Sequence, residues 1–330
     1  MVSLEKGEVH MKFELTAQQR IFYETKVSSE YAIWNQGVVN FFNQRYSYEK
    51  LNNIFNGLIK TFENLRLRVC EKDGEEFSYI EEFHFIDYPF LEFKTEKEVQ
   101  DFAQTFINEP IGSNNVLFKC VIFQTLEKSG FVICAHHLII DGFSTQIMAD
   151  FFDNYLNGRP YIPEKIQSYE DYVKYEEIYK NSNRYNRDRK FWEEQFSTEP
   201  VCDAITQGRN EIDYSSQEVN GNIPCELFVK ISEFCGKNDI SLNSFFDAII
   251  SLYMSRKYEV ENFTLGVPVL NRTTVAEMNT IGLYMHILPL VCNMEPISFI
   301  EFAKPTISCM LATYFSISSS DKFSILNLAR

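Results

Sequence analysis

Apolar residues recur at intervals of three and four along residues 47–62, which predicts an amphipathic helix with one apolar face. Ser47 stands directly before this pattern and can accept a hydrogen bond from a free backbone N–H group as the N-cap. A second helix is predicted over 96–107. Two apolar runs, 116–126 and 130–137, are separated by the turn-like segment EKSG and are predicted to be buried strands.

Helical spacing resumes after residue 142. Ser144 is the predicted cap of this helix, and Gly158 can end it. Pro160 and Pro163 mark a break, after which a charged helical stretch is predicted over 169–196.

Two regions share one order of elements. Residues 241–269 have the pattern of a helix followed by a strand, as residues 47–69 do, although their letters differ. A chain of 330 residues is long enough for two domains with separate cores. We therefore predict an α/β protein of two sandwich lobes: an N-terminal lobe over 1–165, a helical interlobe linker over 166–195 and a C-terminal lobe over 196–330.

Composition and charge exclude several classes of function. A net charge of −15 and a pI near 4.9 repel a phosphate backbone, so nucleic acid is not an expected partner. No apolar run reaches the ~18 residues that span a bilayer, and the first residues do not form a leader, so we expect a cytoplasmic protein without a membrane partner. The eight cysteines are scattered without a C-x-x-C pair, which predicts reduced buried thiols and no metal site.

The segment KNSNRYNRDRK, 180–190, is basic in this acidic chain. Two interpretations remain open. The segment is either a solvated helix face or a docking site for an acidic partner.

The segment VICAHHLIIDGFS, 132–144, places two of the five histidines side by side at the end of a predicted strand. Adjacent side chains near a strand end point to opposite sides, so only one of His136 and His137 can face a reacting centre. A neutral imidazole with a reference pKa of about 6.5 can accept a proton from a reacting group.

His136, His137, Asp141 and Gly142 form the motif HHxxxDG, and with it the chain resembles the condensation domains of nonribosomal peptide synthetases, members of the chloramphenicol-acetyltransferase-like superfamily. The late motif of this family commonly has Asn-Thr where the chain has His286 and Ile287. Other segments of the chain also resemble family motifs and occur in the same order as in the family: LTAQQRIFY (15–23), FENLRLRV (62–69), YEDYVKYEEIY (169–179), RKFWEEQF (189–196), GVPVLNR (266–272) and IGLYMHILPL (281–290).

The resemblance implies two similar lobes in a V shape, with a second lobe that is incomplete because the chain is truncated at its C-terminus. It implies amide-bond formation by transfer of an acyl or peptidyl group from a carrier-protein thioester to an amine. The implied partners are donor and acceptor carrier proteins or domains and an adjacent adenylation domain. The chain itself is expected to bind no cofactor and no metal, because phosphopantetheine arms of the carriers hold the substrates.

The resemblance also assigns roles within the motif. His137 is the expected base, and His136 is a packing residue. The amide of Gly142, near a helix start, is placed to stabilise a developing oxyanion. Asp141 is expected to pair with an arginine and to hold the loop in shape.

Three arginines are candidates for the partner of Asp141: Arg66, Arg68 and Arg272. We favour Arg66.

Three alternative functions remain open. Epimerization domains share HHxxxDG but usually carry a Trp where this chain has Thr145. A free-standing acyltransferase that uses an acyl thioester donor has the same motif. The third alternative is an inactive or carrier-binding remnant, on which the expected truncation would weaken or abolish catalysis.

Overall fold

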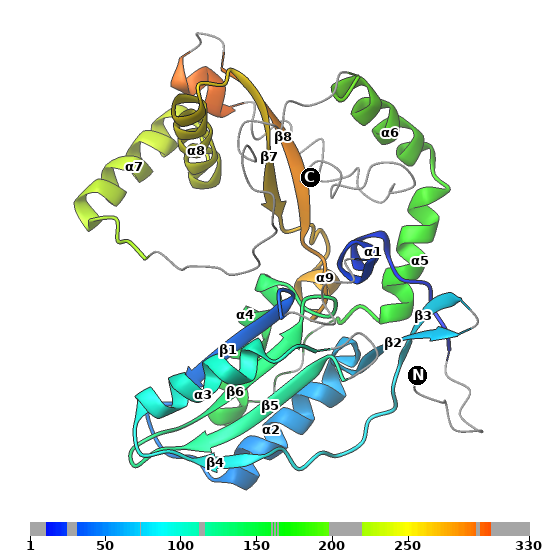
Figure 1. The fold of residues 1–330 in the computed structure, drawn as a ribbon, viewed down its shortest axis with the longest axis vertical. Coiled ribbons are helices and arrows are strands. Elements are labelled where there is room, and N and C mark those ends of the chain that lie inside the picture. Colours follow the sequence, from blue (N-terminus) through cyan, green and yellow to red (C-terminus); the bar gives the residue numbers. More distant parts are fainter. Residues whose placement is uncertain are drawn as a thin grey trace. The chain divides into compact units, whose positions relative to one another are not determined.

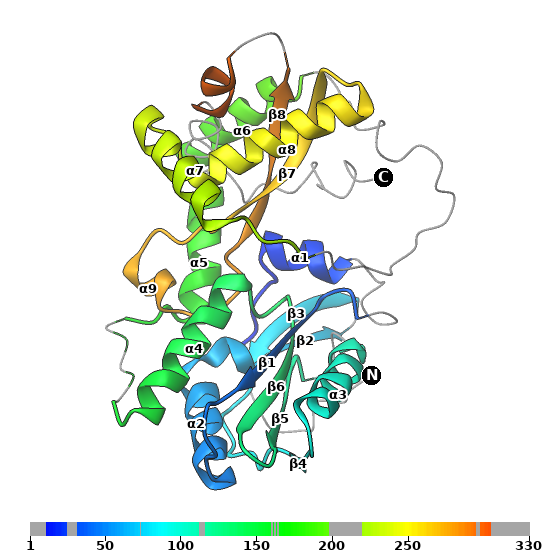
Figure 2. The ribbon, with the colours of Figure 1, turned by 90° about the vertical axis from the view of Figure 1, so that its left-hand side faces the viewer.

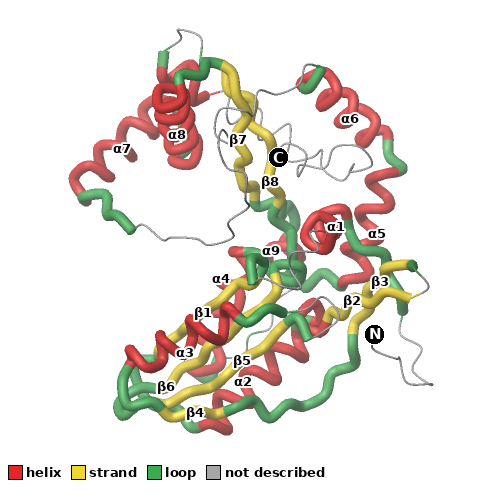
Figure 3. Tube along the Cα trace, in the orientation of Figure 1, coloured by secondary structure: helices red, strands yellow, loops and turns green. Residues whose placement is uncertain are grey.

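The structure is a computed structural model that contains both helices and strands (Figures 1 and 3). The described residues form two compact units. The first lies within Met1–Ile178 and Arg272–Met285, and the second within Tyr179–Asn271 and His286–Arg330. The sequence-based boundaries assign Arg272–Met285 to the C-terminal lobe, whereas this segment packs with the first unit. The structure describes residues 11–24, 32–72, 74–111, 116–159, 161, 163, 165–197, 220–294 and 298–304.

A four-stranded sheet in the order β1-β6-β5-β4 forms the base of the first unit. Strands β1 (Asn35–Phe41) and β5 (Phe118–Gln124) run antiparallel to β6 (Ser129–His136), and β4 (Phe90–Glu92) runs parallel to β5. All residues of β6 are buried, because this strand lies inside the sheet. The two predicted strands are confirmed, and the first histidine of the pair ends the buried strand.

Helices cover both faces of this sheet. Helices α2 (Tyr48–Thr61) and α4 (Gly142–Leu156) contribute to the large core on one face. Helix α3 (Glu96–Asn108) packs on the opposite face, as Figure 2 shows. Ser47 accepts a hydrogen bond from the Lys50 N–H and caps α2, as predicted.

The remaining elements of the first unit surround this layered core. The short 3₁₀ helix η2 (Glu63–Arg66) leads into an antiparallel pair of strands, β2 (Leu67–Lys72) and β3 (Glu75–Ile80). Helix α9 (Val275–Met278) lies in the segment that returns from the second unit. Helix α1 (Ala17–Glu24) precedes the sheet in the chain.

The predicted helix over 169–196 is two helices, α5 (Tyr169–Lys180) and α6 (Asn183–Gln195). The break has a local cause, because Ser182 accepts a hydrogen bond from the Tyr185 N–H and starts a new helix as its N-cap.

The second unit contains an antiparallel pair, β7 (Asn262–Val269) and β8 (His286–Asn293), and helices α6, α7 (Cys225–Asn238) and α8 (Leu242–Tyr258). The Ser251 hydroxyl of α8 lies 3.4 Å from the Cys292 sulfur of β8, in a small apolar core. The predicted helix and strand over 241–269 are confirmed.

Candidate active site

The two histidines lie where β6 ends. The backbone N–H of His136 donates to the Leu117 carbonyl at 2.8 Å, and that of His137 donates to the Trp34 carbonyl at 2.7 Å. A turn then leads into α4, which begins at Gly142. The predicted change from strand to loop to helix is therefore present in the structure.

His136 is a buried residue with 1% of its surface exposed. Its Nδ1 atom accepts a hydrogen bond from the Leu138 N–H at 3.1 Å. Burial lowers the pKa of His136 to about 4, and the neighbouring His137 acts in the same direction. The side chain is therefore neutral near pH 7 and packs inside the unit, which is the geometry expected of a packing residue.

The His137 side chain is partly exposed and stacks on Phe22, with 4.7 Å between the ring centroids and 28° between the planes. Its Nδ1 atom is buried and has no hydrogen-bond partner of standard geometry among the described residues. Burial lowers the pKa of His137, while the carbonyl groups of His137 and Ile140 and the Asp141 carboxylate raise it. The net result favours a neutral imidazole, the form that can accept a proton.

The Asp141 carboxylate is fully buried and makes no hydrogen bond to either imidazole within the described part of the chain. Its Oδ1 atom accepts from the backbone N–H of Ser144 at 2.9 Å and caps α4. Its Oδ2 atom accepts from the backbone N–H groups of Tyr284 at 3.0 Å and Met285 at 3.2 Å. The carboxylate thus joins the helix start to the returning segment.

Arg272 is the partner of Asp141. Its Nη2 atom donates to both carboxylate oxygens, at 3.0 and 3.1 Å, and both side chains are fully buried. The guanidinium carbon lies 4.2 Å from the centroid of the Tyr284 ring and 5.0 Å from that of Phe143. Cation–π contacts of this kind stabilise a buried guanidinium in addition to the ion pair.

The preference for Arg66 was wrong. Arg66 donates from Nε to the Ile59 carbonyl at 3.1 Å and from Nη1 to the Glu81 carbonyl. Arg68 pairs with the Glu81 carboxylate. Both arginines therefore fix the region around η2 and β2, and neither reaches Asp141.

The prediction that Ser144 is the N-cap of α4 was wrong. Asp141 is the cap, and Ser144 is its reciprocal partner, because the Asp141 N–H donates to the Ser144 hydroxyl at 3.3 Å. The same hydroxyl lies 3.0 Å from the Gly282 carbonyl oxygen and accepts from the Gly282 N–H at 3.1 Å. The spacing of a capping box, Asp-x-x-Ser, was the signal in the sequence that could have identified this arrangement.

Gly142 is exposed and is the first residue of α4. Its amide makes no hydrogen bond to another described residue, as is usual in the first turn of a helix. Its φ angle is not in the left-handed region, and a Cβ atom would meet nothing within 4 Å. The backbone geometry therefore does not require glycine here, although the free amide at the positive end of the helix remains available to an anion.

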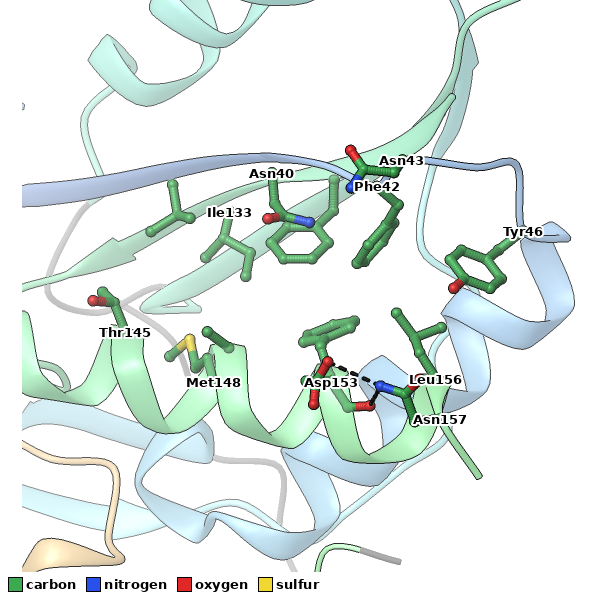
Figure 4. A pocket seen from close by; sticks show the side chains of 14 residues that line it. Asn40, Phe42, Asn43, Tyr46, Ile133, Thr145, Met148, Asp153, Leu156 and Asn157 are labelled. Carbon is green, nitrogen blue, oxygen red and sulfur yellow. Dashed lines mark hydrogen bonds between the residues drawn. The ribbon is translucent and has the colours of Figure 1, made fainter. Parts of the chain in front are cut away.

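A groove of about 310 Å³ lies between β1, β6 and α4 (Figure 4). Its floor is apolar, and the side chains of Ile133 and Met148 point into it from the strand and the helix. Thr145 lies at the end nearest Gly142, and Asn157 lies at the far end of α4. The groove therefore extends along the helix whose first turn follows the motif.

The basic segment 180–190 lies largely on α6, where acidic neighbours compensate its charges. Arg184 lies 3.7 Å from the Asp188 carboxylate, and Arg189 lies 2.8 Å from that of Glu193. Lys190 and Glu194 form a further pair one helical turn apart. This pairing along one helix supports the interpretation of a solvated face.

The described residues hold no group of three or more His, Cys, Asp or Glu side chains that could bind a metal ion. Their helices include none with the length and apolar composition of a bilayer span. Cys202 and Cys309 lie outside the described residues, and the remaining cysteines are free thiols: Cys70, Cys120, Cys134, Cys225, Cys235 and Cys292.

The fold is that of the chloramphenicol-acetyltransferase-like class, as predicted. The first condensation domain of the CDA synthetase has a TM-score of 0.74 and 18% identity, over 93% of this chain and 77% of that chain. A variant of the starter condensation domain of rhizomide synthetase RzmA, solved in complex with C8-CoA, has a TM-score of 0.77 and 16% identity, over 93% of this chain and 73% of that chain.

The family model of the condensation domain matches residues 11–314, and the chain therefore belongs to the condensation domain family. Surfactin synthase subunit 1 of Bacillus subtilis (strain 168) is 24% identical over 314 residues, which are 90% of this chain and 9% of that protein. The chain thus spans less than a tenth of the length of this curated relative.

Proposed function

We propose that this chain forms an amide bond by transferring an acyl or peptidyl group from a carrier-protein thioester to an amine. The observation that carries the proposal is the partly exposed imidazole of His137, whose pKa is lowered by burial, at a strand end close in sequence to the free amide of Gly142. Family membership supports the same chemistry.

In this reaction the amine nitrogen attacks the thioester carbonyl carbon, a C–N bond forms and the C–S bond breaks. An α-amino group has a reference pKa of about 7.7 to 8.0 and is mostly protonated near pH 7. His137 Nε2 accepts or positions the proton that the amine loses, and the leaving thiolate takes up a proton. General-base assistance of this kind is typically worth about 10²- to 10⁴-fold.

The amide of Gly142 is the proposed donor to the oxyanion that develops on the carbonyl oxygen. It is free among the described residues and lies at the positive end of α4. Asp141 and Arg272 act indirectly, because they fix this helix start to the returning segment.

The proposed partners are donor and acceptor carrier proteins or domains, with substrates on phosphopantetheine arms, and an adjacent adenylation domain. The curated relative is a synthase subunit much longer than this chain, which supports a place in a multidomain assembly. We further propose that the groove along α4 takes an apolar part of the donor, since a solved relative binds C8-CoA.

The test is an amide-formation assay with acyl-loaded and aminoacyl-loaded carrier proteins, read by mass spectrometry of the product. We expect turnover that His137→Ala reduces by about 10²- to 10⁴-fold. His84→Ala is the matched control, because this exposed imidazole lies in the segment between β3 and β4. A chain that binds carriers without turnover would favour the remnant interpretation, and equal turnover with free acyl thioesters would favour a free-standing acyltransferase.

A further inference from the structure

Helix α1 contacts the histidine loop through two residues on one face. Gln19 and Phe22 are three positions apart in α1, so their side chains lie on the same side of the helix. Gln19 contacts the carbonyl of Leu138, and Phe22 contacts the imidazole of His137. Neither Gln19 nor Phe22 takes part in the proposed proton transfer itself.

The Gln19 side chain is buried and held by several hydrogen bonds. Its Oε1 atom accepts a hydrogen bond from the Thr16 backbone N–H at 3.1 Å, and the backbone N–H of Gln19 donates to the Thr16 hydroxyl at 3.3 Å. These two hydrogen bonds form a capping box. The Tyr169 hydroxyl also donates to Oε1, at 2.8 Å. Burial raises the pKa of Tyr169 to about 12, so this hydroxyl keeps its proton.

Because these donors occupy the amide oxygen of Gln19, its amide nitrogen points the other way. It donates to the Leu138 carbonyl at 3.4 Å, one residue after His137. The start of α1 is fixed in turn, because the Ala17 N–H donates to both oxygens of the Glu176 carboxylate in α5, at 3.0 and 3.1 Å. The loop after the histidines is thus connected to a buried and well-anchored helix.

Phe22 is 4% exposed, and its ring covers one face of the His137 imidazole. The Trp34 ring meets the Phe22 ring edge-on, with 4.6 Å between centroids, and the Trp34 carbonyl accepts the His137 N–H. The backbone of His137 and the plane of its ring are therefore fixed through the same pair of aromatic residues.

We propose that α1 is a positioning element for His137, in which Gln19 holds the loop and Phe22 fixes the imidazole plane and shields it from water. This inference rests on the proposed role of His137 as the base. It gives the segment LTAQQRIFY a function of its own, which is to hold a base that lies more than a hundred residues later in the chain.

The decisive measurement is the titration of the His137 imidazole in the full chain by NMR, with His137→Gln used to assign its signal. Phe22→Leu keeps an apolar side chain but removes the ring, so the imidazole gains water and its pKa should rise toward 6.5. Phe22→Tyr restores the ring and should restore the wild-type titration. Phe55→Leu is the matched control, because it removes a buried ring of α2 that packs on Phe131 and Phe152. It should destabilise the unit and leave the titration unchanged.

Gln19→Glu is the second variant, since glutamate also serves in a capping box but cannot donate to the Leu138 carbonyl. We expect kcat to fall by about tenfold to a hundredfold with KM little changed, because the base is displaced while substrate contacts remain. An unchanged titration in Phe22→Leu together with an unchanged kcat in Gln19→Glu would overturn the inference. The titration needs no turnover, so the positioning role and the proposed function can fail independently.

Discussion

Replacing Asp141 by asparagine tests the buried ion pair at the start of α4. The carboxylate accepts two hydrogen bonds from Arg272, two from Ser144 and one each from the backbone N–H groups of Tyr284 and Met285. Asparagine keeps one oxygen but turns an NH₂ group toward donors that previously met the other oxygen. It also leaves the Arg272 guanidinium buried without its counter-ion.

The expected loss of stability follows from these contacts. Removing one member of a buried ion pair costs about 3 to 5 kcal/mol, because the remaining charge is uncompensated. The side chains of Asp141 and Arg272 are both fully buried, so solvent does not screen this effect. A whole domain is typically stable by only about 5 to 15 kcal/mol, and the variant should therefore unfold at a much lower urea concentration.

The assay is urea unfolding followed by tryptophan fluorescence. The chain has two tryptophans, Trp34 in the first unit and Trp192 in the second, so a Trp192→Phe background reports on the unit that contains the pair. Asp150→Asn is a matched control at an exposed position of the same helix. It should change the free energy of unfolding by less than about 0.5 kcal/mol.

A double-mutant cycle distinguishes the true partner from the one favoured by sequence. Asp141→Asn combined with Arg272→Gln should be strongly non-additive, whereas the combination with Arg66→Gln should be additive within about 0.5 kcal/mol. Wild-type stability in Asp141→Asn, or equal coupling to both arginines, would refute the assignment of this pair.

Three further predictions concern acid, the oxyanion and the groove. Burial lowers the pKa of both His136 and His286 to about 4 from 6.5. Between these two pKa values the unfolded chain binds more protons than the folded chain does. As the pH falls from about 6.5 to about 4, each histidine should therefore lower the free energy of unfolding by roughly 3 kcal/mol. Urea unfolding at several pH values checks this, and His136→Asn should flatten the dependence. Gly142→Pro removes the free amide at a helix position that tolerates proline, and it should lower kcat by about 10²- to 10³-fold. Gly142→Ala keeps the amide and should not lower kcat. Equal rates in the two variants would exclude this amide as an oxyanion donor. Ala149→Trp at the surface of the groove should raise KM for long acyl donors and leave KM for short donors unchanged. Kinetics over a series of acyl chain lengths checks this, and a KM that does not change with chain length would show that the groove does not bind the donor.

Local patterns predicted much of the first unit, because its elements are specified by neighbouring residues. Ser47 caps α2, and the runs around Ile122 and Ile133 are strands, since each depends on spacing within one element. The partner of Asp141 could not be found in this way. Arg66 and Arg272 both lie within segments that resemble family motifs, and only the return of Arg272–Met285 to the first unit decides between them.

The separation of Asp141 from its partners also bears on how the site forms during synthesis. When residue 178 has been made, the sheet and α4 of the first unit are complete in the chain, but Arg272, Tyr284 and Met285 are still to come. At about 5 to 20 residues per second, translation from residue 178 to residue 285 takes roughly 5 to 20 s. During this interval the Asp141 carboxylate lacks its Arg272 counter-ion, so we expect it to stay hydrated and the start of α4 to remain open. We therefore expect the loop that carries His137 to reach its final form only after the second unit is largely synthesised. A ribosome that stalls before residue 272 would then expose a first unit whose histidine loop is unfinished.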